Sequence, residues 1–118
     1  MASEVDITDF SKGENVQFSS AMLNRDQTPI DDAANVTVEF VISLSPTKDM
    51  LLKFDSSPQI ILQDAPTGMY NFDFADTDFD ILTAGKPYRY EIWTTSAAGV
   101  EIHQVEGSLI LSPATGPD

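Results

Sequence analysis

Residues 36–44 carry the pattern that most restricts how this chain can fold. Every second position is apolar: Val36, Val38, Phe40, Ile42 and Leu44. Alternate side chains of a strand point to opposite faces, so this period of two predicts a half-buried strand and not a helix. Val41 is an apolar exception on the polar face. We expect a partner or a loop to cover it.

Other short apolar segments repeat along the chain and are separated by turn residues. Strands are expected at residues 15–23, 36–44, 50–54, 60–62, 69–74, 88–93 and 100–111, with one short helical turn at 77–82. About seven or eight short strands at such spacing are typical of an all-β protein, an antiparallel β-sandwich. We expect one domain over residues 1–118, with a core at 11–112 and extended N-terminal and C-terminal segments.

The inward positions of these strands predict the residues of the core. The candidates on the strands are Phe72, Phe74, Tyr88, Tyr90 and Leu109. The side chains of Phe79 and Leu82 are expected to extend from the helical turn into the core and to be buried there.

The charge of the chain is strongly negative, with 19 acidic and 6 basic residues and a net charge of −13. Phosphate backbones bind Lys and Arg, so we expect neither nucleic acid nor an anionic membrane as a partner. A solvated surface or a basic protein partner fits this charge. The chain has no cysteine, which excludes disulfides and thiolate metal sites. No signal peptide or membrane span is expected, because no apolar run approaches about 20 residues.

An acidic run begins at Asp76 and continues through Asp78 and Asp80. Alternating carboxylates can bind calcium, but a calcium-binding loop of the helix-loop-helix type needs glycine and glutamate at set positions. Ile81 and Pro87 stand there instead. We therefore expect no metal ligand here. The prediction is that Asp76 caps the short helical turn, with Asp78 in its first turn.

His103 is the only histidine. A catalytic imidazole needs a nucleophile and an orienting acid, and neither Glu101 nor Glu106 forms such a motif with it. We expect an exposed histidine on a strand. The sequence also lacks a phosphate-binding glycine loop, a zincin helix and a serine elbow. We expect no catalytic residue, no cofactor and no enzymatic activity.

The aromatic residues of 88–93 divide between two faces of one strand. Tyr88 and Tyr90 are expected in the core between the sheets. Trp93 lies on the opposite face, and tryptophan is enriched at interfaces. Trp93 and Val41 are therefore the predicted interface residues. Exposed tryptophan and tyrosine side chains beside carboxylates could also form a sugar-binding platform, and this alternative stays open.

Several motifs of turn glycines and core aromatics resemble one family. They lie at residues 13–18, 28–31, 68–72, 76–77, 85–92 and 107–111. With Lys86 and Pro87 as an insertion, they resemble the small immunoglobulin-like β-sandwich proteins of tailed bacteriophage virions. The resemblance covers residues 11–112.

The resemblance implies a non-enzymatic structural protein. Its place would be the virion, assembled in the host cytoplasm, as a capsid decoration or fibre-anchoring part. Its partners would be capsid, connector or fibre subunits in a homo- or hetero-oligomeric assembly, with the terminal segments lying along neighbouring chains. The alternatives are a head–tail connector or baseplate component, and a carbohydrate-binding or adhesion module, with calcium as a possible aid.

Overall fold

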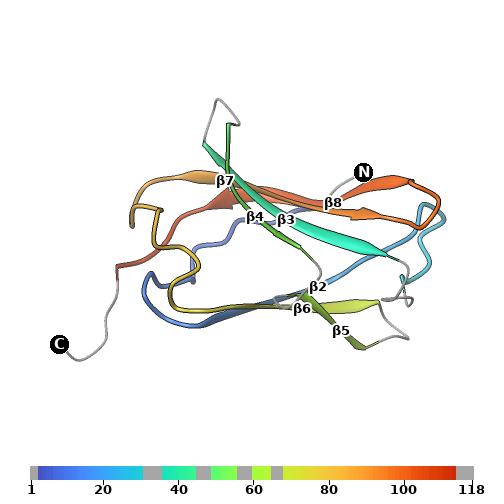
Figure 1. The fold of residues 1–118 in the computed structure, drawn as a ribbon, viewed down its shortest axis with the longest axis horizontal. Coiled ribbons are helices and arrows are strands. Elements are labelled where there is room, and N and C mark those ends of the chain that lie inside the picture. Colours follow the sequence, from blue (N-terminus) through green and yellow to red (C-terminus); the bar gives the residue numbers. More distant parts are fainter. Residues whose placement is uncertain (1–2, 31–35, 45–48, 56–59, 65–67, 114–118) are drawn as a thin grey trace.

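The computed structural model describes residues 3–30, 36–44, 49–55, 60–64 and 68–113. Its strands are β1 (Ser3–Glu4), β2 (Val16–Ala21), β3 (Thr37–Leu44), β4 (Met50–Asp55), β5 (Ile60–Asp64), β6 (Met69–Phe74), β7 (Tyr88–Thr95) and β8 (Glu101–Leu109). They form a five-stranded sheet in the order β1-β8-β7-β3-β4 and a three-stranded sheet in the order β2-β6-β5. Figure 1 shows the two sheets as two layers. The described part of the chain is all-β and sandwich-like, as the strand pattern predicts.

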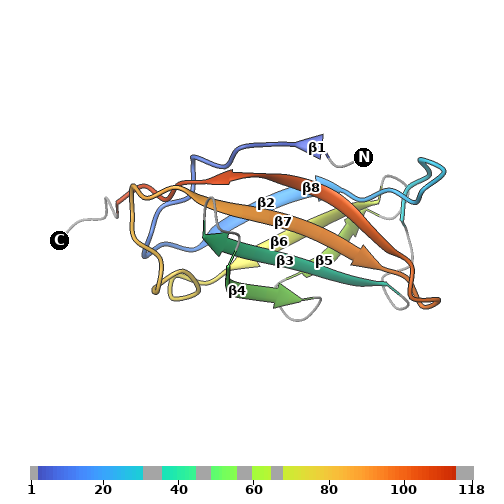
Figure 2. The ribbon, with the colours of Figure 1, turned by 90° about the horizontal axis from the view of Figure 1, so that it is seen from above.

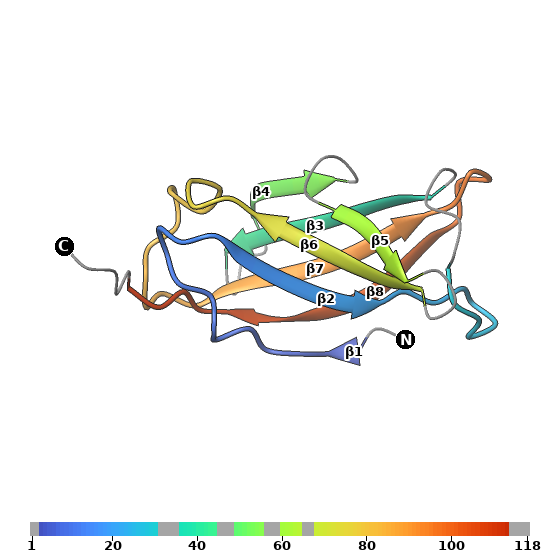
Figure 3. The same cartoon turned by 90° about the horizontal axis from the view of Figure 1, so that it is seen from below.

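The strands pair antiparallel, with one exception at the edge of the larger sheet. Figure 2 shows this sheet from above, with β1 beside β8, and this pair is parallel. Figure 3 shows the smaller sheet, in which β6 lies between β2 and β5. All seven predicted strands are present at nearly the predicted residues. None of the described segments forms a helix long and apolar enough to cross a membrane.

The core between the sheets is built largely from aromatic rings. Phe40 of β3 is completely buried and reaches Phe72 and Phe74 of the other sheet, at ring-centroid distances of 5.7 and 5.1 Å. It also stacks on Tyr90 of β7 at 5.3 Å. The five predicted core residues on the strands are all buried, as are Phe79 and Leu82. The period-two prediction for the core is confirmed.

The acidic segment that follows β6 differs from its prediction. It forms successive turns, in which Asp78 N–H bonds to Ala75 and Leu82 N–H bonds to Phe79, and not a helical turn. The Asp78 carboxylate, and not Asp76, accepts a backbone hydrogen bond, from Ala75 N–H at 2.8 Å. An α-helix needs consecutive bonds between residues four apart, and a 3₁₀-helix needs consecutive bonds between residues three apart. These bonds span three residues but begin only at every second residue, Asp78, Asp80 and Leu82. The predicted Asp76 cap and helical turn are therefore wrong.

The N-terminal segment lies along β8 of its own chain. Val5 N–H bonds to the carbonyl of Glu106, and Ile7 N–H bonds to the carbonyl of Ser108. Ile7 and Phe10 are buried in the core, although the expected core starts at residue 11. Their side chains thus extend the core past its predicted N-terminal limit.

Tyr90 connects the core to this N-terminal segment. Its buried hydroxyl donates a hydrogen bond to the carbonyl of Val5. Burial, and to a lesser extent the charge of Asp6, raises the pKa of this hydroxyl above its usual value of 10.0. The folded state therefore favours the neutral phenol.

We expect Tyr90→Phe to lower the free energy of unfolding at pH 7 by about 1 kcal/mol, because one hydrogen bond is lost. Because the pKa of Tyr90 is raised in the folded state, the contribution of its hydroxyl to stability is fully present below about pH 10. This contribution is lost as the pH rises from there towards the folded-state pKa, because the tyrosine of the unfolded chain then ionises. The stability difference between wild type and variant should therefore shrink above about pH 10. Urea unfolding from pH 7 to 11 measures it. A difference that grows with pH would contradict this prediction.

Candidate interaction face

The outward face of the five-stranded sheet holds both predicted interface residues. Tyr90 and Ile92 of β7 point into the core, so Glu91 and Trp93 point outward. On the neighbouring strand, Val41 pairs with Glu91. Trp93 and Val41 are each half-buried and share this face. We call it the outer face.

Trp93 is covered on one side by the only histidine. It pairs with His103 across β7 and β8, and the two rings are parallel within 6° with centroids 4.4 Å apart. The His103 side chain is 23% exposed. The histidine lies on a strand as predicted, but the prediction that its side chain is exposed is wrong, because a tryptophan from the next strand packs against it.

A β-bulge in β8 decides which residues join His103. Ile92 pairs with Val105, but the next residue, Trp93, pairs with His103, so Gln104 is an extra residue. Gln104 and Val105 are both buried. In a regular strand, residues three apart point to opposite faces. The bulge instead brings His103 and Glu106 to the same face.

Gln104 is held inward by a small buried network. Its side-chain amide donates to the Leu23 carbonyl at 2.7 Å and to Thr94 Oγ1 at 2.9 Å, and its oxygen accepts from Leu23 N–H at 3.1 Å. These bonds connect the end of the β2 segment to β7 and β8. The side-chain amide of Gln104 thus satisfies both the backbone N–H and the backbone carbonyl of Leu23.

We expect Gln104→Leu to lower the free energy of unfolding by about 2–3 kcal/mol, because it leaves polar groups of Leu23 and Thr94 without partners. Chemical denaturation measures the loss. Gln17→Leu, an exposed change of the same kind on β2, is the matched control and should alter stability by less than about 0.5 kcal/mol. Equal effects of the two changes would contradict the proposed role of the network.

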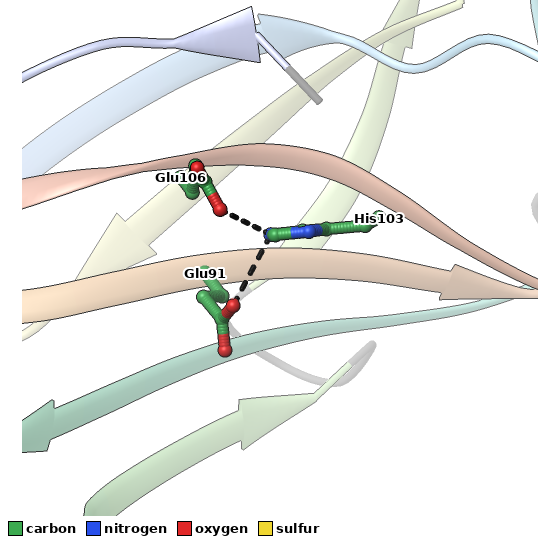
Figure 4. Close-up of side chains that lie close together, drawn as sticks. All are labelled: Glu91, His103 and Glu106. Atoms are coloured by element: carbon green, nitrogen blue, oxygen red, sulfur yellow. Dashed lines mark ion pairs between the residues drawn. The ribbon is translucent and has the colours of Figure 1, made fainter. Parts of the chain in front are cut away.

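Four charged or titratable side chains converge beside Trp93. Glu91 lies directly opposite Glu106 across the strands, an unfavourable pairing of like charges. Arg89 Nη2 lies 2.8 Å from Glu106 Oε1. His103 Nε2 lies 3.4 Å from Glu91 Oε2 and 3.5 Å from Glu106 Oε1, as Figure 4 shows. The arrangement can bind a cation between the two carboxylates.

A second ion pair borders Trp93 on its other side. Glu39 pairs with Trp93 across β3 and β7, and its carboxylate lies 2.8 Å from Lys53 Nζ. The hydrogen bond to Glu39, followed by the charge of that carboxylate, raises the pKa of Lys53. The half-buried tryptophan is thus flanked by charged side chains.

Within the described residues, Glu91, His103 and Glu106 are the only group with metal-ligand spacing. The acidic turn at 76–80 does not take part in it. Sequence reasoning missed this group because its members come from two strands and because only the bulge aligns them. The pairing of Trp93 with His103 had no recognisable pattern in the sequence either.

Comparison with known proteins does not assign a family to this chain. No protein-family model matches the chain, and no curated protein matches it.

Proposed function

We propose that the chain is a non-enzymatic structural part of a tailed-phage virion. In this proposal it is an immunoglobulin-like β-sandwich that binds other virion proteins as a capsid decoration or fibre-anchoring part. The observation that carries the binding role is the position of Trp93 and Val41, both half-buried on one sheet face. The place in a virion rests on the resemblance of the turn and core motifs.

The outer face suits protein binding because its aromatic residue is already held in position. The stack with His103 restricts the Trp93 ring, so a partner would lose little rotamer entropy when it covers the exposed side. Tryptophan is enriched among interface hot spots, which are surrounded by contacts that exclude water. The net charge of −13 favours a basic partner surface and would speed encounter with it.

One sheet edge offers a second means of binding. β4 ends the order of the five-stranded sheet, whereas β1 covers β8 at the opposite end. Met50, the first residue of β4, is 64% exposed. An edge strand with free backbone groups can accept a strand from another chain. We propose β4 as the edge for such an addition.

Fractionation of a phage lysate tests this function. We expect mass spectrometry to find the chain in gradient-purified particles, at a fixed ratio to the major capsid or fibre subunit. Treating particles with nuclease should not release it, because no nucleic acid holds it. Recovery of the chain from the particle-free fraction, with none in purified particles, would overturn the proposal.

A carbohydrate-binding role is the second candidate, and the surroundings of Trp93 favour it. The ring lies between Glu39 on β3 and His103 on β8, and carboxylates beside an aromatic ring can bind sugar hydroxyls while the ring covers the sugar. A glycan array with Trp93→Ala as control distinguishes this role. Binding that requires Trp93 supports it, and an array without hits removes it.

A further inference from the structure

The atoms of Glu91, His103 and Glu106 are spaced as ligands and not as hydrogen-bond partners. The distances of 3.4 and 3.5 Å from His103 Nε2 to the two carboxylate oxygens exceed the range of about 2.7–3.2 Å for an N–H···O bond. Tetrahedral zinc with bonds of about 2.0–2.2 Å separates its ligand atoms by about 3.3–3.5 Å. All three ligand atoms lie within 4.8 Å of one another. The group thus has a size that can hold one metal ion.

His103 Nε2 makes no hydrogen bond to the described protein atoms, although two carboxylates lie near it. The atom is buried from solvent and makes no hydrogen bond, although buried polar atoms are nearly always bonded. It points between two carboxylates (Figure 4). If Nε2 is unprotonated, its lone pair and the two anions all face one small space. A divalent cation in that space removes the repulsion and satisfies the nitrogen.

The neighbouring residues fix these side chains as outer partners fix metal ligands. Trp93 holds the imidazole plane through the parallel stack. Arg89 donates to Glu106 Oε1 at 2.8 Å, and carboxylate ligands in metal sites are commonly hydrogen-bonded in this way. A carboxylate has about four lone-pair positions, so this bond leaves others for a metal. The bulge at Gln104 sets the strand geometry for both ligands on β8.

We propose that Glu91, His103 and Glu106 bind one Zn²⁺ on the outer face, with the fourth coordination position open to water. One imidazole nitrogen and two carboxylate oxygens suit zinc. Calcium prefers six to eight oxygen ligands, which this group does not provide. Glu91 and Glu106 carry two negative charges and Arg89 one positive charge, so the ion changes the local charge from −1 to +1.

Titration of the metal-free chain with Zn²⁺ tests the site by calorimetry. Trp93 fluorescence is a second readout, because the only tryptophan in the sequence stacks on the ligand histidine. We expect one ion per chain. His103→Gln and Glu106→Gln should each weaken binding by about 100-fold or more, since even outer partners of metal ligands are worth about 10–100-fold. Glu14→Gln, which removes the same charge at an exposed site, should bind as wild type does.

Co²⁺ in place of Zn²⁺ tests the geometry, because tetrahedral Co²⁺ absorbs visible light strongly. Circular dichroism of each variant checks that it folds. Equal zinc affinity in wild type and in both ligand variants would overturn the site, as would an absence of saturable binding by the wild type. The titration uses the isolated chain. A negative result would therefore count against the zinc site alone and not against the proposed role in a virion.

Discussion

Replacing Phe40 by alanine is expected to lower the free energy of unfolding by about 3–5 kcal/mol. Phe40 is completely buried, and its ring contacts aromatic rings of both sheets. Removing the ring leaves a cavity at the junction of the two layers, which neighbouring rings cannot fill without leaving their own contacts. Urea or guanidinium unfolding measures the loss.

Phe40→Leu is the matched control, because it keeps an apolar side chain and most of the volume. We expect this variant to lose less than half as much stability as Phe40→Ala. The aromatic core would not be the main contact between the sheets if Phe40→Ala lost less than about 1 kcal/mol, a value typical of an average substitution.

Replacing Gly107 by alanine should detach the N-terminal segment from β8. A methyl group at this position would lie 2.0 Å from the backbone oxygen of Val5, so the segment must move. Exposing Ile7 costs about 1.5–3 kcal/mol, and each lost backbone hydrogen bond adds about 0.5–1.5 kcal/mol. With the two bonds from Val5 and Ile7, we expect a total loss of about 2.5–6 kcal/mol, comparable with that of Phe40→Ala.

Hydrogen exchange distinguishes detachment from a general loss of stability. The amides of Val5 and Ile7 should lose protection in Gly107→Ala, whereas those of β3 should keep theirs relative to global unfolding. Ser108→Ala, an exposed change at the next position, is the control and should leave both groups unchanged. Full protection of Val5 and Ile7 in Gly107→Ala would show that the strand bends to admit the methyl group.

The strands and most of the core were predictable because alternation reports burial directly. Val38, Phe40 and Ile42 alternate with less apolar residues, and only one face of a strand can be buried in a two-layered protein. The same argument identified Tyr88 and Tyr90 as inward and Trp93 as outward. These predictions depend only on neighbouring residues of one strand.

The N-terminal segment and the acidic turn could not be predicted in the same way. Ile7 and Phe10 are three residues apart and do not fit one period of two. Their burial depends on a parallel pairing with β8, about 100 residues away along the chain. Asp76 has the sequence position of a cap, but Asp78 makes the bond to Ala75. Local sequence preference allows either aspartate to accept a backbone hydrogen bond at this turn. Which of them does so depends on the path of the chain into the core.

The group around His103 was hidden from the sequence for another reason. His103 and Glu106 are three residues apart, which predicts opposite faces of a strand. The extra residue Gln104 reverses this relation, and no glycine or proline marks the bulge. The amide of this extra residue bonds to Leu23 and Thr94, and the bond to Leu23 joins distant parts of the chain. A bulge of this kind becomes visible only in the folded structure.

A photo-crosslinking side chain in place of Val41 tests most directly whether the outer face binds another virion protein. Val41 is half-buried beside Glu91, and its replacement leaves the Trp93 stack in place. Gln17, exposed on β2 of the other sheet, is the control position. We predict that irradiated particles give one crosslinked virion protein from position 41 and none from position 17. Particles that contain the chain but yield crosslinks only from position 17, or none from position 41, would contradict the account.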